Sequence, residues 1–485
     1  MKQRYIYNMH KPWHSLIFGV VIFIALGLLS FTFPSGELKI TSVLKVSFPS
    51  LNSLFNKSAK KDISKALETL NAVDTSFIIG DAVSVKTGLP RDTSAKLITW
   101  IQARNKQVLN NFFNALSGLK TNPKSVHVLH YGDSQIEGDR ITDYLRLKLQ
   151  GQFGGSGPGL ISLTPIAEGV INRVTASNGW DRYNIFTMKD KRVSHNNYGV
   201  LGGFSRFHDY KKAGDTNTTS SASLVVTTTK LGGANAMAYK NIKLFYGGAK
   251  FKTWSEFYDG PALIRADSFE AGGNFRVKEY NITPGSNIHT FKFSGKDSPD
   301  FYGMSLESDN GVVVDNIGLR GSSGTFFHQI SFGQLKQFYD YLNVRLIILQ
   351  FGGNALPSIK DATMAVNYAG YLRGQISILK KLAPRASILF IGPSDMSVKV
   401  GTEYVTYPYL EELRDAIKKE VLSSGCAFFD MYDCMGGKNS MATWVDKKLA
   451  ASDYIHFSPQ GARKIATLLY SALINDYNAY LKEKH

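Results

Sequence analysis

Hydrophobic residues follow two different patterns along this chain, and the change between them divides it into regions. A largely apolar, β-prone run at residues 126–131 ends at Gly132, and residues 136–149 then show the periodicity of an amphipathic helix. After residue 308 the same alternation of strand and helix returns several times. Buried strands separated by helices are typical of a parallel sheet covered on both faces, so the pattern predicts an α/β domain.

The later elements can be placed from periodicity and run length. The predicted strands lie at residues 311–318, 344–351, 386–391 and 427–429. The predicted helices lie at residues 95–119, 326–342, 364–382, 410–422 and 459–477.

Residues 166–307 do not follow this alternation of strands and helices. They are rich in Gly, Thr, Ser, Asn and aromatic residues, and turn signals separate short stretches in which apolar and polar residues alternate singly. This pattern is typical of a β-sandwich or jelly roll. We therefore expect an all-β insert within the α/β domain, because a surface loop tolerates insertion. The α/β domain would then comprise residues 95–165 and 308–485.

The N-terminal region carries an uncharged apolar stretch, residues 15–33, which is long enough to span a bilayer. Lys2, Arg4 and Lys11 precede it, which favours a cytoplasmic N-terminus and an exported remainder. A cleaved signal peptide is the competing interpretation, but the stretch is long for one and no Ala-x-Ala site follows. We expect a single-pass membrane protein whose remaining part is periplasmic or extracellular. Its first segments would be a cytoplasmic N-terminus, a transmembrane anchor and a juxtamembrane stalk, at residues 1–14, 15–33 and 34–94.

Composition narrows the class of partner. The chain has 485 residues, of which 43% are hydrophobic and 20% charged, so we expect a globular protein of two or three domains. Its net charge of +17 suits an anionic partner, but the basic residues are scattered and no nucleic-acid motif accompanies them, so nucleic acid is not expected. Cys426 and Cys434 lack metal-ligand spacing, and one disulfide or two buried thiols both remain open.

The first candidate for chemistry is Ser134, which follows the predicted strand in the sequence Gly132-Asp133-Ser134. A serine at a strand-to-helix turn presents its hydroxyl at the carboxyl edge of the sheet, where a helix N-terminus favours negative charge. This hydroxyl needs a base, and His456 is the best candidate. Asp453, three residues earlier, is spaced to orient the imidazole, although the same segment also suits an ordinary helix-entry loop.

Acyl transfer also requires donors for a developing oxyanion. Two turns that follow predicted strands offer them: the segment 316–324, which contains Gly318 and Gly321, and the segment Gly352-Gly353-Asn354. A glycine N–H can approach a substrate closely, and the Asn354 amide can donate. Each turn also suits a purely structural role.

Together these pieces resemble the SGNH (GDSL-type) hydrolase family in content and order. The matching blocks are Gly132-Asp133-Ser134, Asn316-x-Gly318-x-x-Gly321, Gly352-Gly353-Asn354 and Asp453-x-x-His456. The resemblance implies a flavodoxin-like sheet, acyl-ester chemistry and no metal or cofactor. It makes Ser134 the nucleophile, His456 the base and Asp453 its orienting group. It also implies an oxyanion hole formed by the Ser134 N–H, the Gly321 N–H and the Asn354 side chain.

The chain departs from the family pattern at two positions. Gln135 stands where Leu is usual, and Ala355 stands where Asp often follows the asparagine. Neither change removes a required chemical group.

A finer resemblance is to Ape-type peptidoglycan O-acetylesterases. It rests on residues 132–140, on the Gly-rich segment 153–159 and on the all-β insert, and it implies that the insert is a carbohydrate-binding module. Several aromatic residues of the insert could stack on sugars or fill the sandwich core, since aromatics dominate such cores. They are Trp180, Tyr183, Trp254, Phe257 and Tyr258.

We therefore expect a membrane-anchored serine esterase that removes O-acyl, in particular O-acetyl, groups from peptidoglycan or another cell-envelope polysaccharide. One alternative is an O-acetyltransferase with the same residues that works with a membrane acyltransferase partner, because the site residues do not encode the acceptor. A second alternative is a non-catalytic glycan-binding protein of the cell envelope.

Overall fold

The computed structural model describes residues 101–185, 192–208, 218–283 and 285–484, together with a few positions near the N-terminus. The predicted cytoplasmic segment, anchor and stalk lie outside the described residues, except for Ile17, Val21 and two short paired strands. Those strands are β1 (Glu37–Lys39) and β2 (Lys45–Ser47). No helix in the described part of the chain is long and apolar enough to cross a membrane.

A parallel sheet forms the centre of the α/β domain. Its strand order is β16-β4-β17-β18-β21, with β3 added antiparallel at the edge. The strands are β3 (Ile101–Gln102), β4 (Ser125–Gly132), β16 (Gly311–Gly318), β17 (Val344–Gln350), β18 (Ser387–Ile391) and β21 (Ala427–Phe429). The five parallel strands have the flavodoxin-like order 2-1-3-4-5. The predicted α/β fold is therefore confirmed.

Helices cover both faces of this sheet, because its strands expose apolar side chains alternately to each face. Val126 and Val128 pack with one group of helices, and Leu129 and Tyr131 with the other. The first group contains α4 (Asn110–Gly118), α5 (Thr142–Phe153) and α11 (Pro459–Lys484). The second contains α6 (Phe332–Tyr341), α7 (Ala362–Leu382) and α8 (Leu410–Ser423). Two short helices, α9 (Met431–Met435) and α10 (Ser440–Asp446), precede α11.

Two helices begin later than the hydrophobic pattern predicts. In the described part of the helix expected at residues 95–119, Ile101 pairs with Phe429 as a strand, and helical structure starts at η1 (Lys106–Leu109) and α4. The helix expected from residue 136 becomes α5, which begins at Thr142. Gly138 and Asp139 have φ angles of 65° and 69°, in the left-handed region that interrupts a helix.

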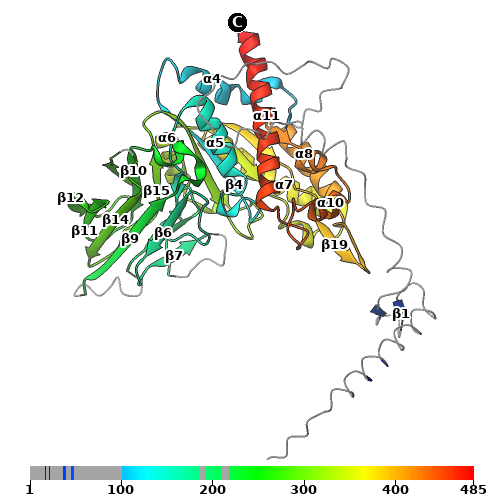
Figure 1. The fold of residues 1–485 in the computed structure, drawn as a ribbon, viewed down its shortest axis with the longest axis horizontal. Coiled ribbons are helices and arrows are strands. Elements are labelled where there is room, and N and C mark those ends of the chain that lie inside the picture. The colour runs from blue at the N-terminus through cyan, green and yellow to red at the C-terminus, as the bar shows by residue number, and fades with distance from the viewer. Residues whose placement is uncertain are drawn as a thin grey trace, which may run out of the picture.

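Between α5 and β16 the chain forms a β-sandwich, which lies beside the α/β domain (Figure 1). One sheet contains β5 (Gly159–Ile161), β7 (Asp181–Asn184), β8 (Gly203–Arg206), β10 (Asn241–Gly247), β13 (Arg276–Asn281) and β15 (Asp300–Glu307). The other contains β6 (Asn172–Ala176), β9 (Ser220–Thr228), β11 (Thr253–Asp259), β12 (Ala262–Phe269) and β14 (Ile288–Gly295). The sandwich includes β5, which precedes residue 166, because β5 pairs with β15.

The aromatic residues singled out in this region are divided between the core and the surface. Tyr183 and Phe257 are buried, and Trp180 packs against the buried cluster between the sheets. Trp254, by contrast, is 50% exposed. Tyr258 is half-buried, with the Lys292 ammonium 4.6 Å from the centre of its ring.

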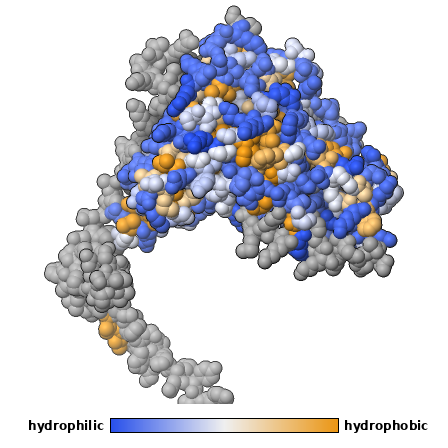
Figure 2. Space-filling view, turned by 180° about the vertical axis from the view of Figure 1, so that it is seen from behind, coloured by the Kyte–Doolittle hydropathy of each residue, from blue (hydrophilic) through white to orange (hydrophobic). Residues whose placement is uncertain are grey.

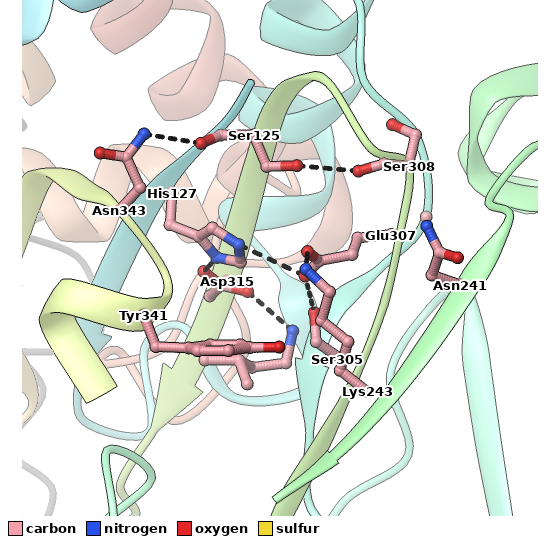
Figure 3. Close-up of polar contacts among 12 residues, drawn as sticks. Ser125, His127, Asn241, Lys243, Ser305, Glu307, Ser308, Asp315, Tyr341 and Asn343 are labelled. Atoms are coloured by element: carbon pink, nitrogen blue, oxygen red, sulfur yellow. Dashed lines mark hydrogen bonds and ion pairs between the residues drawn. The ribbon is translucent and has the colours of Figure 1, made fainter. Parts of the chain in front are cut away.

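A buried polar network joins the sandwich to the parallel sheet (Figure 3). His127 of β4 lies 2.7 Å from Asp315 of β16 and 3.3 Å from Glu307 of β15. The Lys243 ammonium of β10 lies 2.6 Å from Glu307. Burial alone would lower the pKa of His127, but the two carboxylates outweigh it and raise this pKa to about 9. The protonated imidazole therefore bridges one acid from each domain.

Cys426 and Cys434 are both buried and unpaired, so of the two possibilities that the sequence left open the structure contains two buried thiols.

On the face seen in Figure 2, hydrophilic residues cover most of the described surface, and hydrophobic residues gather in smaller groups near its centre.

Candidate active site

Ser134 lies on the tight turn that follows β4, which we call the serine turn (residues 133–139). The turn is closed by hydrogen bonds from the Ile136 N–H to the Asp133 carbonyl and from the Glu137 N–H to the Ser134 carbonyl. A Cβ at Gly132 would lie 2.9 Å from the Ile136 side chain and 3.2 Å from the Gln350 carbonyl. A glycine is therefore required there for the turn to pack closely over the sheet.

The structure brings together three of the predicted site residues. Ser134 Oγ lies 2.8 Å from His456 Nε2, and His456 Nδ1 lies 2.7 Å from Asp453 Oδ2. The other Asp453 oxygen accepts the N–H groups of Ile455 and His456, at 2.9 and 3.0 Å. Partial burial would raise the pKa of Asp453, but the hydrogen bonds from His456 and its neighbour lower it. An ionised Asp453 holds the Nδ1 proton and leaves Nε2 free to accept the serine proton.

Gln135 fixes the backbone on both sides of His456. Its Nε2 donates to the Ile455 carbonyl at 2.9 Å, and its Oε1 accepts the Phe457 N–H at 3.1 Å. Gln135 itself is buried. Sequence reasoning missed this contact, although the departure from the usual leucine was the signal that marked the position.

The segment before His456 is also held from the other side. Tyr454 has a left-handed φ of 59°, and its ring stacks on Tyr404 with a centroid separation of 3.6 Å. Tyr404 belongs to a hairpin formed by β19 (Ser397–Val400) and β20 (Glu403–Thr406). The Ser397 N–H donates to the Tyr454 carbonyl at 3.0 Å. The hairpin therefore supports the loop that carries both Asp453 and His456.

Asp133 is a second residue that sequence reasoning missed. It is buried, and burial raises the pKa of its carboxyl to about 6, against the opposing effect of the Gln135 N–H bond, of His456 and of the Asn354 side chain. The Gln135 N–H lies 2.9 Å from Asp133 Oδ1. The carboxyl group thus helps to fix the residue after the nucleophile and the neighbouring Asn354.

These side chains line a cavity of about 190 Å³, which we call the catalytic cavity. Its lining includes Asp133, Ser134, Gln135, Gln350, Phe351, Gly353, Asn354, Pro357, Pro393, Ser394, Met396, Met431, Ile455 and His456. The nucleophile and the base therefore face one space in which an ester can bind.

The three predicted oxyanion donors are placed differently. Ser134 and Asn354 both line the catalytic cavity, and the Asn354 Nδ2 donates to the Ser322 carbonyl at 3.2 Å. Gly321 has a left-handed φ of 77°, but among the described residues it is not part of the cavity lining. Asn354 therefore lines the cavity while its side chain bonds Ser322 and Asp133, and Gly321 lies outside the lining.

The loop that carries Gly321 is nonetheless tied to the serine turn. A Cβ at Gly318 would lie 3.1 Å from the Glu137 Cα, so the end of β16 approaches this turn closely. The Arg320 guanidinium forms a fork with both Glu137 carboxylate oxygens, at 2.7 to 3.1 Å. The segment from Asn316 to Gly321 is therefore held in place by its contacts with the serine turn.

Comparison with known proteins agrees with this geometry. Residues 282–464 match the family model of the GDSL-like lipase/acylhydrolase family. Gly321, Asn354, Asp453 and His456 fall within the matched segment, and Ser134 precedes it. Three of the four sequence blocks named above therefore lie in a segment that is similar to this family.

A solved structure of a peptidoglycan O-acetylesterase is similar over 78% of this chain and 99% of its own, with a TM-score of 0.61 and 18% sequence identity. At that identity the likeness shows a shared fold. A family two carbohydrate esterase from Clostridium thermocellum, solved in complex with cellohexaose, matches over 53% of this chain and 92% of its own. Its TM-score is 0.23 and its sequence identity 12%. None of the curated proteins compared with the chain matches it.

Proposed function

We propose that this protein is a serine esterase that removes O-acyl, in particular O-acetyl, groups from a cell-envelope glycan such as peptidoglycan. The observation that carries the proposal is the continuous contact from Ser134 Oγ to His456 to Asp453, at 2.8 and 2.7 Å, beside an open cavity. The fold shared with a peptidoglycan O-acetylesterase supports the choice of substrate.

The reaction follows from the positions of these atoms. Ser134 Oγ attacks the ester carbonyl carbon while His456 Nε2 takes the hydroxyl proton. The Asn354 amide and the Ser134 N–H stabilise the oxyanion, and the resemblance to SGNH hydrolases adds the Gly321 N–H as a third donor. His456 then protonates the leaving sugar oxygen, and water attacks the acyl-enzyme to release the acid and restore Ser134.

The sandwich offers a surface for the polymer. A cavity of about 470 Å³ on one sheet is lined by Ser177, Ser221, Ala222, Ser223, Trp254, Glu256, Lys292, Phe293 and Ser294. An exposed indole ring suits stacking on a sugar face, and hydroxyl and charged groups around it suit hydrogen bonds to sugar hydroxyls. We assign glycan binding to this face.

The proposed location is the outer face of a membrane. The uncharged stretch at residues 15–33 would anchor the protein, with the catalytic domain in the periplasm or at the extracellular face. This anchor would keep the enzyme close to its envelope substrate. It is also the feature that favours the second candidate, an O-acetyltransferase that receives acetyl from a membrane acyltransferase partner.

Acetate release separates these functions. Purified protein should release acetate from O-acetylated peptidoglycan, and Ser134→Ala should lower the rate by at least about 10³-fold. Intact binding of glycan by Ser134→Ala would show that this variant is folded. Failure of the wild type to hydrolyse p-nitrophenyl acetate, or equal rates for wild type and Ser134→Ala, would refute the esterase. Rapid transfer of acetyl to a sugar hydroxyl with little free acetate would identify the transferase.

A further inference from the structure

A second cavity lies on the other side of the serine turn, where the α/β domain meets the sandwich. This junction cavity has a volume of about 110 Å³. Its lining includes Glu137 and Asp139 of the serine turn, Gly318 at the end of β16, and Leu160 and Arg182 of the sandwich. The serine turn therefore contributes to both cavities, with Ser134 lining the catalytic cavity and Glu137 lining the junction cavity.

The junction cavity contains an arginine without a partner. The guanidinium of Arg182 makes no hydrogen bond or ion pair with any part of the chain that the structure describes. Burial lowers the pKa of Arg182, and the nearby Glu137 only partly opposes this effect. Both oxygens of the Glu137 carboxylate already accept hydrogen bonds from Arg320, so its single negative charge is shared between two guanidinium groups.

A second arginine of the same cavity has one unused donor. Arg146 is buried, and its Nε donates to the Val314 carbonyl at 2.7 Å. One of its terminal nitrogens donates to Asp139 Oδ1 at 2.9 Å, whereas the other has no hydrogen-bond partner. Each acid of the cavity is therefore matched by one arginine, and the charge of Arg182 remains unbalanced.

An unbalanced guanidinium in a partly enclosed space costs desolvation energy unless an anion binds there. Surface arginines usually satisfy this need with water, but Arg182 shares its cavity with the unused donor of Arg146. Guanidinium groups bind carboxylates and phosphates through two parallel hydrogen bonds. The donors of this cavity thus match an oxyanion.

We propose that the junction cavity is a subsite for an acidic group of the acylated glycan, a carboxylate carried by a sugar, and that Arg182 is its main determinant. The inference rests on the esterase function proposed above. The cavity has room for a carboxylate with its linking carbons. Recognition by Arg182 would place the ester-bearing sugar across both domains, with its acyl group at Ser134.

Three chemically defined esters test this subsite. They are 6-O-acetyl-N-acetylmuramic acid, which carries a carboxylate, neutral 6-O-acetyl-N-acetylglucosamine, and the 1-phosphate of the latter. Wild type should prefer the carboxylate ester over the neutral one in kcat/KM by about ten- to hundredfold, the value of one charge-assisted hydrogen-bonded pair. Arg182→Gln should remove that preference, mainly through KM, and Arg182→Lys should restore part of it.

The control variant is Arg173→Gln, which removes an exposed arginine of the sandwich that pairs with Glu168 outside the junction cavity. It should leave all three substrates unchanged, and p-nitrophenyl acetate turnover should be equal in all variants. Equal effects of Arg182→Gln on the acidic and the neutral ester, or no effect on either, would overturn the subsite. A preference for the phosphate ester alone would keep the anion site and overturn the carboxylate assignment.

A binding measurement separates this inference from the esterase function. Calorimetric titration of Ser134→Ala with N-acetylmuramic acid should show binding that Ser134→Ala/Arg182→Gln loses. Ester turnover without this difference would refute the subsite and leave the esterase intact. Binding without any Ser134-dependent turnover would refute the esterase and leave an anion site in a protein of another function.

Discussion

At the residue scale, the side chains that react could be predicted and most of those that hold them could not. Ser134, His456 and Asp453 occur in short motifs whose spacing follows from the chemistry, and the structure places them within hydrogen-bonding distance of one another. Gln135 and Asp133 act through contacts with segments far along the chain, such as Ile455 and Asn354. No local pattern encodes those contacts, so only the fold reveals them.

Gln135 provides a test of such a positioning role. Gln135→Met keeps the length of the side chain but removes both hydrogen bonds to the backbone around His456. At about 1 kcal/mol for each bond, kcat for p-nitrophenyl acetate should fall about tenfold or more while KM stays nearly constant. Stopped assays over a range of substrate concentrations separate the two constants.

Gln135→Glu is the matched control for this experiment. It keeps an acceptor for the Phe457 N–H but loses the donor to the Ile455 carbonyl, so its kcat should lie between those of wild type and Gln135→Met. A wild-type kcat in Gln135→Met, or a loss that appears only as a lower melting temperature, would contradict the positioning role.

At the element scale, the network around His127 links β4 and β16 of the parallel sheet to β15 and β10 of the sandwich. A histidine within a strand gives no sign of this in the sequence, because its two acidic partners lie about 180 residues later. Helix starts were missed for a similar reason. Ile101 joins a sheet edge and Asp139 adopts a left-handed φ because of tertiary contacts, which override local periodicity.

The raised pKa of His127 predicts a loss of stability in alkali. The folded pKa of about 9 exceeds the reference value of 6.5, so the stabilisation is complete below 6.5 and is lost as the pH rises through 9. The shift corresponds to on the order of 3 kcal/mol, since one pKa unit is worth about 1.4 kcal/mol. Urea unfolding at pH 6 and pH 10 should show that decrease in the wild type.

His127→Gln isolates this contribution, because the amide cannot carry the positive charge between Asp315 and Glu307. The variant should be less stable than wild type at pH 6 and should show a much smaller decrease towards pH 10. A decrease of the same size in both proteins would show that other groups cause the alkaline loss.

At the scale of the whole molecule, the alternation of hydrophobic residues predicts two kinds of architecture, and the structure contains a parallel α/β sheet and a two-sheet sandwich. The boundary between the two domains could not be predicted from the sequence. The short strand β5 shows no alternation of apolar and polar residues, and it joins the sandwich only by pairing with β15. The sequence also did not show which aromatic residues of the sandwich are buried and which are exposed. Phe257 and Trp254 are three residues apart on β11, so the pleat sends them to opposite faces.

The exposed Trp254 gives the last prediction, which concerns how the sandwich serves the distant catalytic cavity. If its ring stacks on a sugar, Trp254→Ala should weaken binding of O-acetylated peptidoglycan about three- to tenfold, the value of one aromatic contact of about 0.5–1.5 kcal/mol. KM for the polymer should rise, whereas turnover of p-nitrophenyl acetate should not change, because that ester needs only the catalytic cavity.

Leu231→Ala is the matched control, since it removes an exposed apolar side chain that is not part of the sandwich cavity lining. Sedimentation with insoluble peptidoglycan measures the affinity. Equal retention of Trp254→Ala and Leu231→Ala would show that this face of the sandwich does not bind the glycan and that the polymer is held by the two cavities at the serine turn alone.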